Sequence, residues 1–222
     1  MVGRLFCLSA CLLLSSCSIV TSQTPSAAIP STSTTVTALN FAPLTQWQER
    51  AFVGNTRYTL QQDGHSLEAK SHASASMLYR QITVDLHKTP MLNWQWKIQQ
   101  TLSNIDEQTR SGDDFPARIY IAIKPRPFSF YPRALNYVWA NHSKKLSSWS
   151  SPYTKDAVVI ALESGNNQAG QWVKAKRNIR NDIQQYFGED IQFIEGIAVM
   201  TDTDNTQQSA TAYYRNVFFS QE

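Results

Sequence analysis

Alternation of apolar and polar residues with a period of two runs through most of this chain beyond residue 40. Residues 91–99 read Met-Leu-Asn-Trp-Gln-Trp-Lys-Ile-Gln, and residues 117–123 read Ala-Arg-Ile-Tyr-Ile-Ala-Ile. Side chains alternate between the two faces of a strand, so each such segment predicts a strand with one buried face. About ten segments of this kind, separated by turn residues, predict an antiparallel β-sandwich.

Two local signals add detail to this prediction. Asp63-Gly64 lies between two alternating segments, which is a strong indication of a hairpin turn. Apolar side chains recur at helical spacing from Ile179 to Phe187, and Gly188 follows where a helix would end. The pattern predicts one short amphipathic helix over about residues 176–187.

Residues 1–17 are typical of a secretory leader with a lipobox. Arg4 precedes a short apolar run, and Leu-Ser-Ser stands directly before Cys17. The run is too short to span a bilayer, which needs about 20 apolar residues. We expect cleavage before Cys17 and a lipid anchor on its thiol; a plain signal peptide cut nearby is the alternative. Ser18 stands where Asp would signal retention in the inner membrane, which favours the outer membrane facing the periplasm.

The rest of the chain divides into a tether and one domain. Residues 18–40 are rich in Ser, Thr, Ala and Pro and carry no charge, which predicts a flexible tether. Residues 41–222 are expected to form a single domain. All three cysteines lie in the leader, so this domain has no disulfide and no thiolate metal site. The net charge is +3 and no long Lys/Arg run occurs, so we expect no nucleic-acid partner.

Several motifs carry a resemblance to a known family. They are Leu92–Lys97, Gly112–Arg118, Tyr137–Trp139, Arg177-Asn178 with Asp182, and Met200–Thr206. In these motifs the chain resembles DUF3047, a family of exported bacterial proteins of unknown function, from about Phe41 onward. The resemblance implies an exported setting and supplies no catalytic residues. The segment Tyr213–Phe219 gives a looser likeness to jelly-roll modules of the galactose-binding type.

Asp113 and Asp114 form the first candidate site. The pair lies in a loop just before an apolar strand. Adjacent carboxylates repel each other, so they need a cation, an arginine or backbone N–H groups nearby. Arg118 is close in sequence. The pair is therefore either a ligand site or a loop that is stabilised by Arg118.

A second acidic loop contains Asp202, Asp204 and Asn205. Alternate oxygen ligands on a loop suit calcium, although this string lacks the glycine and the glutamate of an EF-hand. A turn in which these side chains bond their own backbone is the alternative. If both acidic loops met in space, they would form a metal site or an acid/base pair for glycoside hydrolysis.

Aromatic residues form the third candidate. Trp139 and Trp172 lie in or near turn-rich segments, where an exposed ring could stack on a sugar. Packing in the core is the alternative for both. Trp94 and Trp96 share a strand face with Leu92, which favours the core.

These observations lead to one expected function and two alternatives. We expect a lipid-anchored envelope protein that binds a glycan or another polar envelope component without catalysis. The expected ligand-binding residues are Asp113, Asp114, Arg118, Trp139 and Trp172, and the expected metal ligands are Asp202, Asp204 and Asn205, with calcium as the ion. One alternative is a hydrolase of envelope polysaccharide that uses Asp113, Asp114, Asp202 or Asp204. The other is a structural lipoprotein that binds another protein.

Overall fold

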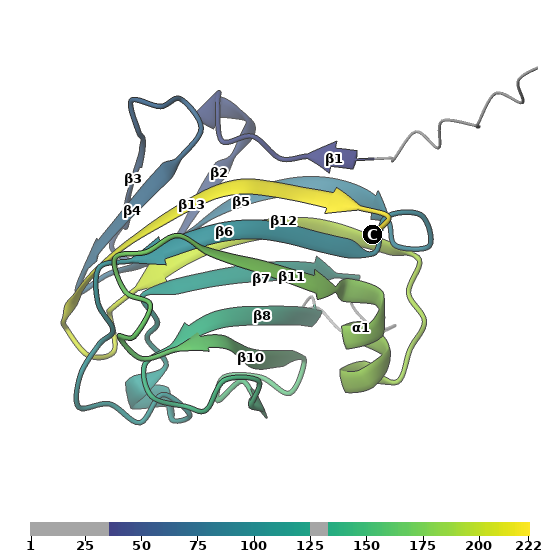
Figure 1. Ribbon diagram of the computed structural model, residues 1–222. Helices are drawn as coiled ribbons and strands as arrows, with labels where there is room; N and C mark the ends of the chain where they lie inside the picture. Colours follow the sequence, from purple (N-terminus) through teal and green to yellow (C-terminus); the bar gives the residue numbers. More distant parts are fainter. Residues whose placement is uncertain (1–35, 125–132) are drawn as a thin grey trace, which may run out of the picture. The chain divides into compact units, whose positions relative to one another are not determined.

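The computed structural model describes residues 36–124 and 133–222, which fold mainly into β-strands (Figure 1). The strands are β1 (Val36–Ala38), β2 (Gln48–Val53), β3 (Arg57–Leu60), β4 (Leu67–His72), β5 (Ala75–Asp85), β6 (Met91–Ile98), β7 (Ala117–Ile123), β8 (Arg133–Ala140), β9 (Ser148–Ser150), β10 (Ala157–Ser164), β11 (Val173–Asn178), β12 (Phe193–Asp202) and β13 (Ser209–Ser220). The α-helix is α1 (Ile179–Phe187), and two 3-10 turns cover Leu44–Gln46 and Arg110–Gly112.

The strands form two sheets that pack as the predicted sandwich. Sheet A has the order β11-β6-β13-β4-β3, with β1 against the end of β13. Sheet B has the order β2-β5-β12-β7-β8-β10-β9. Among the described strands, β8 and β10 are a parallel pair and the other pairs are antiparallel. The predicted antiparallel sandwich therefore includes one parallel pair, because the chain returns through β9 between β8 and β10.

The core lies between the sheets and follows the period-two pattern. Alternate residues of β6, from Leu92 to Ile98, are buried against alternate residues of β7, from Ile119 to Ile123. Trp94 and Trp96 pack edge to face with ring centroids 5.4 Å apart. The expectation that these two tryptophans belong to the core is confirmed.

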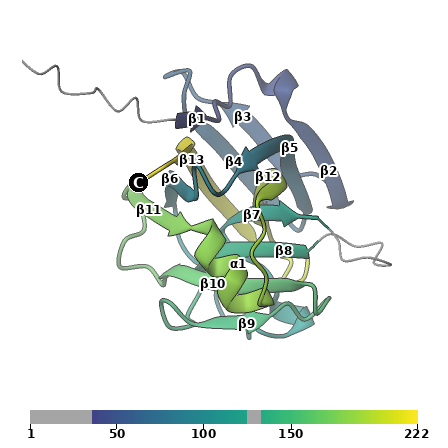
Figure 2. The same cartoon turned by 90° about the vertical axis from the view of Figure 1, so that its right-hand side faces the viewer.

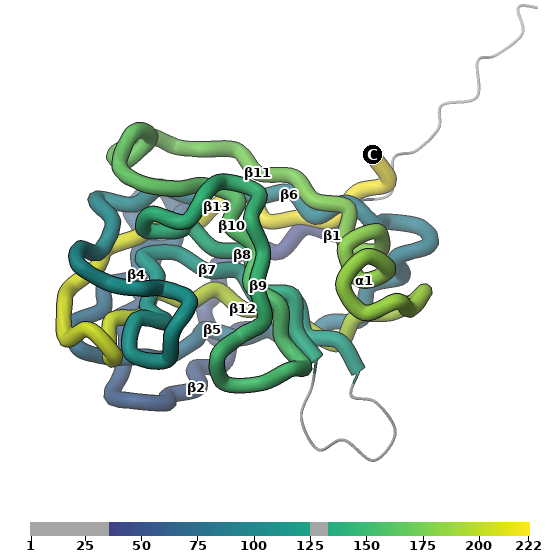
Figure 3. Tube along the Cα trace, turned by 90° about the horizontal axis from the view of Figure 1, so that it is seen from below, coloured from purple at the N-terminus to yellow at the C-terminus, as the bar shows by residue number. Residues whose placement is uncertain are grey.

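Helix α1 is shorter than predicted. The predicted range began at residue 176, but residues 173–178 extend as β11 and pair with β6. The Asn178 side chain accepts a hydrogen bond from the backbone N–H of Asn181 at 3.0 Å and so caps the helix. Gly188 ends it with φ of 71°, as expected. Figures 1 and 3 show α1 at one end of the strands, and Figure 2 looks onto that end.

Asp182 on the buried side of α1 connects the helix to sheet B. Its carboxylate accepts a hydrogen bond from the Tyr137 hydroxyl at 2.5 Å and forms an ion pair with Arg177. Burial, together with the charge of Asp182, raises the pKa of the Tyr137 hydroxyl well above its ordinary value. The Tyr137 hydroxyl therefore stays protonated and donates its hydrogen bond to Asp182.

The hairpin predicted at Asp63-Gly64 is confirmed. The Asp63 carboxylate accepts hydrogen bonds from the backbone N–H groups of His65 and Ser66 at 2.9 and 2.8 Å. It also accepts one from the Ser66 hydroxyl at 2.7 Å. These bonds close the turn between β3 and β4.

The sandwich begins earlier in the chain than predicted. Val36–Ala38 pairs with β13, and Leu39 is 2% exposed, so the last residues of the predicted tether belong to the sandwich. The apolar Leu39 reaches the core because pairing of β1 places it there. The predicted leader, the lipid anchor at Cys17 and the rest of the tether lie outside the described residues. Within the described ranges, no helix has the length and apolar character needed to cross a membrane.

Candidate functional site

The two acidic loops meet around Arg118 on the outer side of sheet B. Arg118 projects from β7, and its Nε and Nη2 donate hydrogen bonds to the Asp202 carboxylate at 2.7 and 2.5 Å. Its Nη1 lies 3.4 Å from Oδ2 of Asp113. All three side chains are almost fully buried. The expectation that Arg118 partners Asp113 is confirmed, and Asp202 is its stronger partner.

Asp114 connects the same two loops through backbone groups. Its carboxylate accepts hydrogen bonds from the N–H groups of Asn205 and Thr206 at 3.2 and 2.7 Å. Oxygen atoms of Asp114, Asp202 and Asp204 lie within 4.8 Å of one another. Burial, and then the charge of Asp114, raises the pKa of the Asp204 carboxyl. These three carboxylates are the residues that could hold a hard cation.

The structure changes the predicted metal set by one residue. The Asn205 side chain contacts the Tyr153 hydroxyl at 3.1 Å, whereas Asp114 lies with Asp202 and Asp204. A calcium ion at this set stays a prediction. A calcium-dependent rise in Tm that Asp204→Asn abolishes would establish it.

A hollow of about 330 Å³ borders this cluster and contains Asp113, Tyr153 and Asp204 in its wall. The carboxylates of Asp114 and Asp202 are held by backbone amides and by Arg118. Their main contribution is to tie residues 112–118 to residues 202–206, and the hydrolase alternative stays a prediction.

Trp139 is not a ligand-binding residue. It is 0% exposed, and its ring lies 5.8 Å from that of Trp96 in the core. Its Nε1 donates a hydrogen bond to the carbonyl of Gly165 at 3.0 Å. The expectation of a sugar-stacking ring is wrong here, because alternation along β8 turns Trp139 toward the inside of the sandwich.

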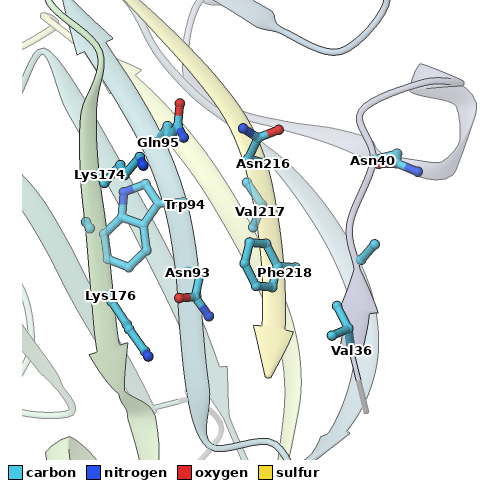
Figure 4. Close-up of a pocket in the computed structure, with 12 residues that line it drawn as sticks. Val36, Asn40, Asn93, Trp94, Gln95, Lys174, Lys176, Asn216, Val217 and Phe218 are labelled. Carbon is cyan, nitrogen blue, oxygen red and sulfur yellow. The ribbon is translucent and has the colours of Figure 1, made fainter. Parts of the chain in front are cut away.

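The other side of the molecule, the outer face of sheet A, is polar and hollowed. We define this face by the outward-pointing side chains of β11, β6, β13, β4 and β3. One hollow of about 650 Å³ crosses β11, β6 and β13 and reaches β1. Figure 4 shows its wall, with the labelled side chains Asn93, Gln95, Lys174, Lys176, Asn216 and Phe218 on these strands. The amides and amines can donate hydrogen bonds to a polar ligand.

A backbone irregularity helps to shape this hollow. The pairing of β13 with β6 shifts between Arg215 and Phe218, which marks a β-bulge. Within it, Asn216 has φ of 52° in the left-handed region, which Asn tolerates better than most residues. The bulge turns the exposed Asn216 into the wall of the hollow and returns Phe218 to the outer face.

A second hollow of about 530 Å³ lies at the other end of the same face. Its wall contains Trp172, Tyr213 and Lys97, together with residues of the β3–β4 hairpin. The rings of Trp172 and Tyr213 lie 6.4 Å apart at a steep angle, and both side chains are half-buried. The Arg215 guanidinium lies 4.0 Å from the Trp172 ring, and Lys97 Nζ lies 4.3 Å from the Tyr213 ring.

The two hollows lie end to end along the strands. Lys97 pairs with Tyr213 and Gln95 pairs with Arg215, so successive outward positions of β6 and β13 run from one hollow to the other. The row from Asn93 to Lys97 is about 13 Å long at the usual rise of a strand. Of the predicted site residues, Trp172 lies on this face, and the Arg118 cluster does not.

Comparison with known proteins places this domain in a family. A family model described as "Protein of unknown function (DUF3047)" matches residues 45–218. The chain belongs to the DUF3047 family. A comparison with curated protein sequences finds no match.

Some solved structures resemble the DUF3047 domain at low sequence identity. One is the family 11 carbohydrate-binding module of a cellulosomal cellulase of Clostridium thermocellum, with 12% identity, a TM-score of 0.43, and coverage of 83% of this chain and 94% of that chain. Another is the xyloglucanase domain of a type three effector from Sinorhizobium fredii, with 9% identity, a TM-score of 0.43, and coverage of 78% and 92%. A third is a family 29 carbohydrate-binding module from Piromyces equi, with 8% identity, a TM-score of 0.37, and coverage of 86% and 92%. The functional argument for this chain depends on its own geometry.

Sequence reasoning missed most of the outer face of sheet A in this DUF3047 domain. Gln95 and Lys97 alternate with buried residues of β6, so their outward direction could have been predicted. The pairing of β6 with β11 and β13 could not have been predicted. This pairing brings Lys174 and Tyr213 beside Gln95 and Lys97.

Proposed function

We propose that this DUF3047 domain binds a glycan on the outer face of sheet A, without catalysis. The observation that carries the proposal is the continuous row of polar and aromatic side chains between the two hollows. Trp172 and Tyr213 supply apolar ring surface with a polar edge, which suits the flat faces of sugar rings. Asn93, Gln95 and Lys97 supply donors and acceptors for sugar hydroxyls.

The carboxylates near this face support binding rather than catalysis. Asp63 lines the second hollow, but hydrogen bonds from Ser66 and His65 lower its pKa to about 2. A carboxyl that is ionised at neutral pH cannot serve as a general acid. Glu68 forms an ion pair with Lys70 at 3.0 Å. Asp63 is therefore unsuited to donate the proton that cleavage of a glycosidic bond needs, and Glu68 is held by Lys70.

The test is affinity gel electrophoresis of the full chain with soluble polysaccharides. We expect at least one polysaccharide to retard the wild type. Trp172→Ala or Tyr213→Ala should lower the affinity for that polysaccharide, calculated from the retardation, at least about tenfold. Tyr153→Ala is the matched control, because Tyr153 is an exposed tyrosine beside the Arg118 cluster. Loss of binding in Tyr153→Ala with retention in Trp172→Ala would move the site to sheet B and overturn the proposal.

We also propose that the protein is exported and held at the envelope by a lipid on Cys17. Support for this comes from the apolar run and the Leu-Ser-Ser triplet before Cys17. Metabolic labelling with a radioactive fatty acid tests it: the full chain should take up label, and Cys17→Ala should not. Equal labelling of both chains, or labelling of neither, would contradict the anchor.

A further inference from the structure

The outer face of sheet A carries a strong excess of positive charge. Its outward cations are Arg57, Lys70, Lys97, Lys174, Lys176 and Arg215. Among the described residues at outward positions of these five strands, Glu68 is the carboxylate, and it is paired with Lys70. The face as a whole therefore presents cations that the fold itself does not neutralise.

The first hollow is cationic at its edge. Lys174 and Lys176 are exposed on β11, two residues apart, so their side chains project about 7 Å from one another. They lie opposite Gln95 and Asn93 in the register. No carboxylate occurs among the described residues that line this hollow. Among the described residues, neither Lys174 nor Lys176 forms an ion pair with a carboxylate.

The cations continue into the centre of the sheet. Lysines on an edge strand such as β11 also prevent pairing with another chain, so Lys174 and Lys176 alone would be explained by that role. Lys97 and Arg215 lie on the interior strands β6 and β13, where that reason does not apply. Both lie beside the aromatic rings of Trp172 and Tyr213, and neither forms an ion pair with a carboxylate among the described residues.

We propose that the glycan bound on this face is a polyanion, an acidic polysaccharide whose carboxylates pair with Lys174, Lys176, Lys97 and Arg215. This inference rests on the proposed function and names the class of ligand. Cations that repel one another along the face are neutralised when such a chain binds. The rings of Trp172 and Tyr213 would contact the sugar faces, while the row of cations would select charged over neutral chains.

The test measures binding of the full chain to polygalacturonate and alginate, each compared with its methyl ester. Esterification removes the negative charge and keeps the sugar backbone. We expect the wild type to bind at least one acid form at least about fivefold more tightly than its ester, and to lose this preference as salt is raised from about 0.05 to about 0.5 M. Lys174→Gln with Lys176→Gln should weaken binding of the acid form about fivefold and weaken any binding of the ester by a clearly smaller factor.

The control is Lys144→Gln with Lys155→Gln, which removes the same charge from exposed positions outside this face. It should bind as the wild type does. If the lysine variants of β11 and the control bind equally, or if acid and ester bind equally, the polyanion inference is overturned while glycan binding stands. If neither polysaccharide binds in either form, or if the chain binds only vesicles of phosphatidylglycerol, the inference is overturned. Loss of all glycan binding across the wider panel would overturn the proposed function itself.

Discussion

Arg118 on β7 donates two hydrogen bonds to Asp202, a residue 84 positions later at the end of β12. This contact lies on the opposite side of the sandwich from the proposed glycan surface. It joins the loop before β7 to the loop after β12, and both partners are almost fully buried. The two acidic motifs of the sequence therefore form one structural cluster, and the proposed ligand surface is elsewhere.

Replacing Arg118 should destabilise the fold strongly. In Arg118→Met the Asp202 and Asp113 carboxylates stay buried without their cation, which we expect to cost about 3–5 kcal/mol in the free energy of unfolding. Urea unfolding followed by tryptophan fluorescence measures the change. Arg50→Met, which removes an exposed arginine, is the control and should change stability little. A cost below about 1 kcal/mol for Arg118→Met would show that the cluster does not hold the loops together.

The two tryptophans that the sequence predicts as ligand-binding residues, Trp139 and Trp172, should respond to substitution in opposite ways. Trp139→Ala leaves a cavity in the core and should lower the free energy of unfolding by about 3–5 kcal/mol. Trp172→Ala removes a half-buried ring from the outer face of sheet A and should cost under about 1 kcal/mol. Urea unfolding of both variants checks this. Similar costs for the two would contradict the assignment of Trp139 to the core and Trp172 to the surface.

The β-bulge at Asn216 should depend on its left-handed backbone. Asn216→Ala should lower the free energy of unfolding by about 1–2 kcal/mol, because Cβ disfavours a positive φ. Asn216→Gly should be close to neutral, since glycine adopts this conformation readily. Thermal unfolding of the two variants measures the difference in stability. Equal stability of the two would show that the bulge does not need a residue that tolerates the left-handed conformation.

The Asp63 turn should show a pKa that depends on Ser66. In Ser66→Ala the hydroxyl donor is lost, so the Asp63 pKa should rise from about 2 toward the ordinary value. Because the pKa is lower in the folded state, Asp63 contributes stability above about pH 4, and this is lost as pH falls from about 4 to about 2. Carboxyl NMR titration measures the pKa. His65→Gln is the control and should change the pKa little, because it keeps the backbone N–H at position 65 and removes only the imidazole, whose charge is the smallest of the causes.

The position of the acidic cluster was only partly predictable. The sequence places Asp113 and Asp114 before one strand and Asp202 and Asp204 after another, with no indication that β7 and β12 are neighbours. Their pairing in sheet B, with Met200 opposite Arg118, brings the loops together. Asn205 was expected among the metal ligands for its spacing, but the turn directs its side chain to Tyr153.

The sequence by itself determined the strands, the hairpin at Asp63 and the C-terminal end of α1, because alternation, turn residues and a left-handed glycine act within a few residues. Only the tertiary structure decided that Trp139 is buried, that β11 occupies part of the predicted helix, and that Lys174, Lys97 and Tyr213 share one face. Those facts depend on which strands pair, and pairing is set by burial of the whole core between residues far apart in the chain.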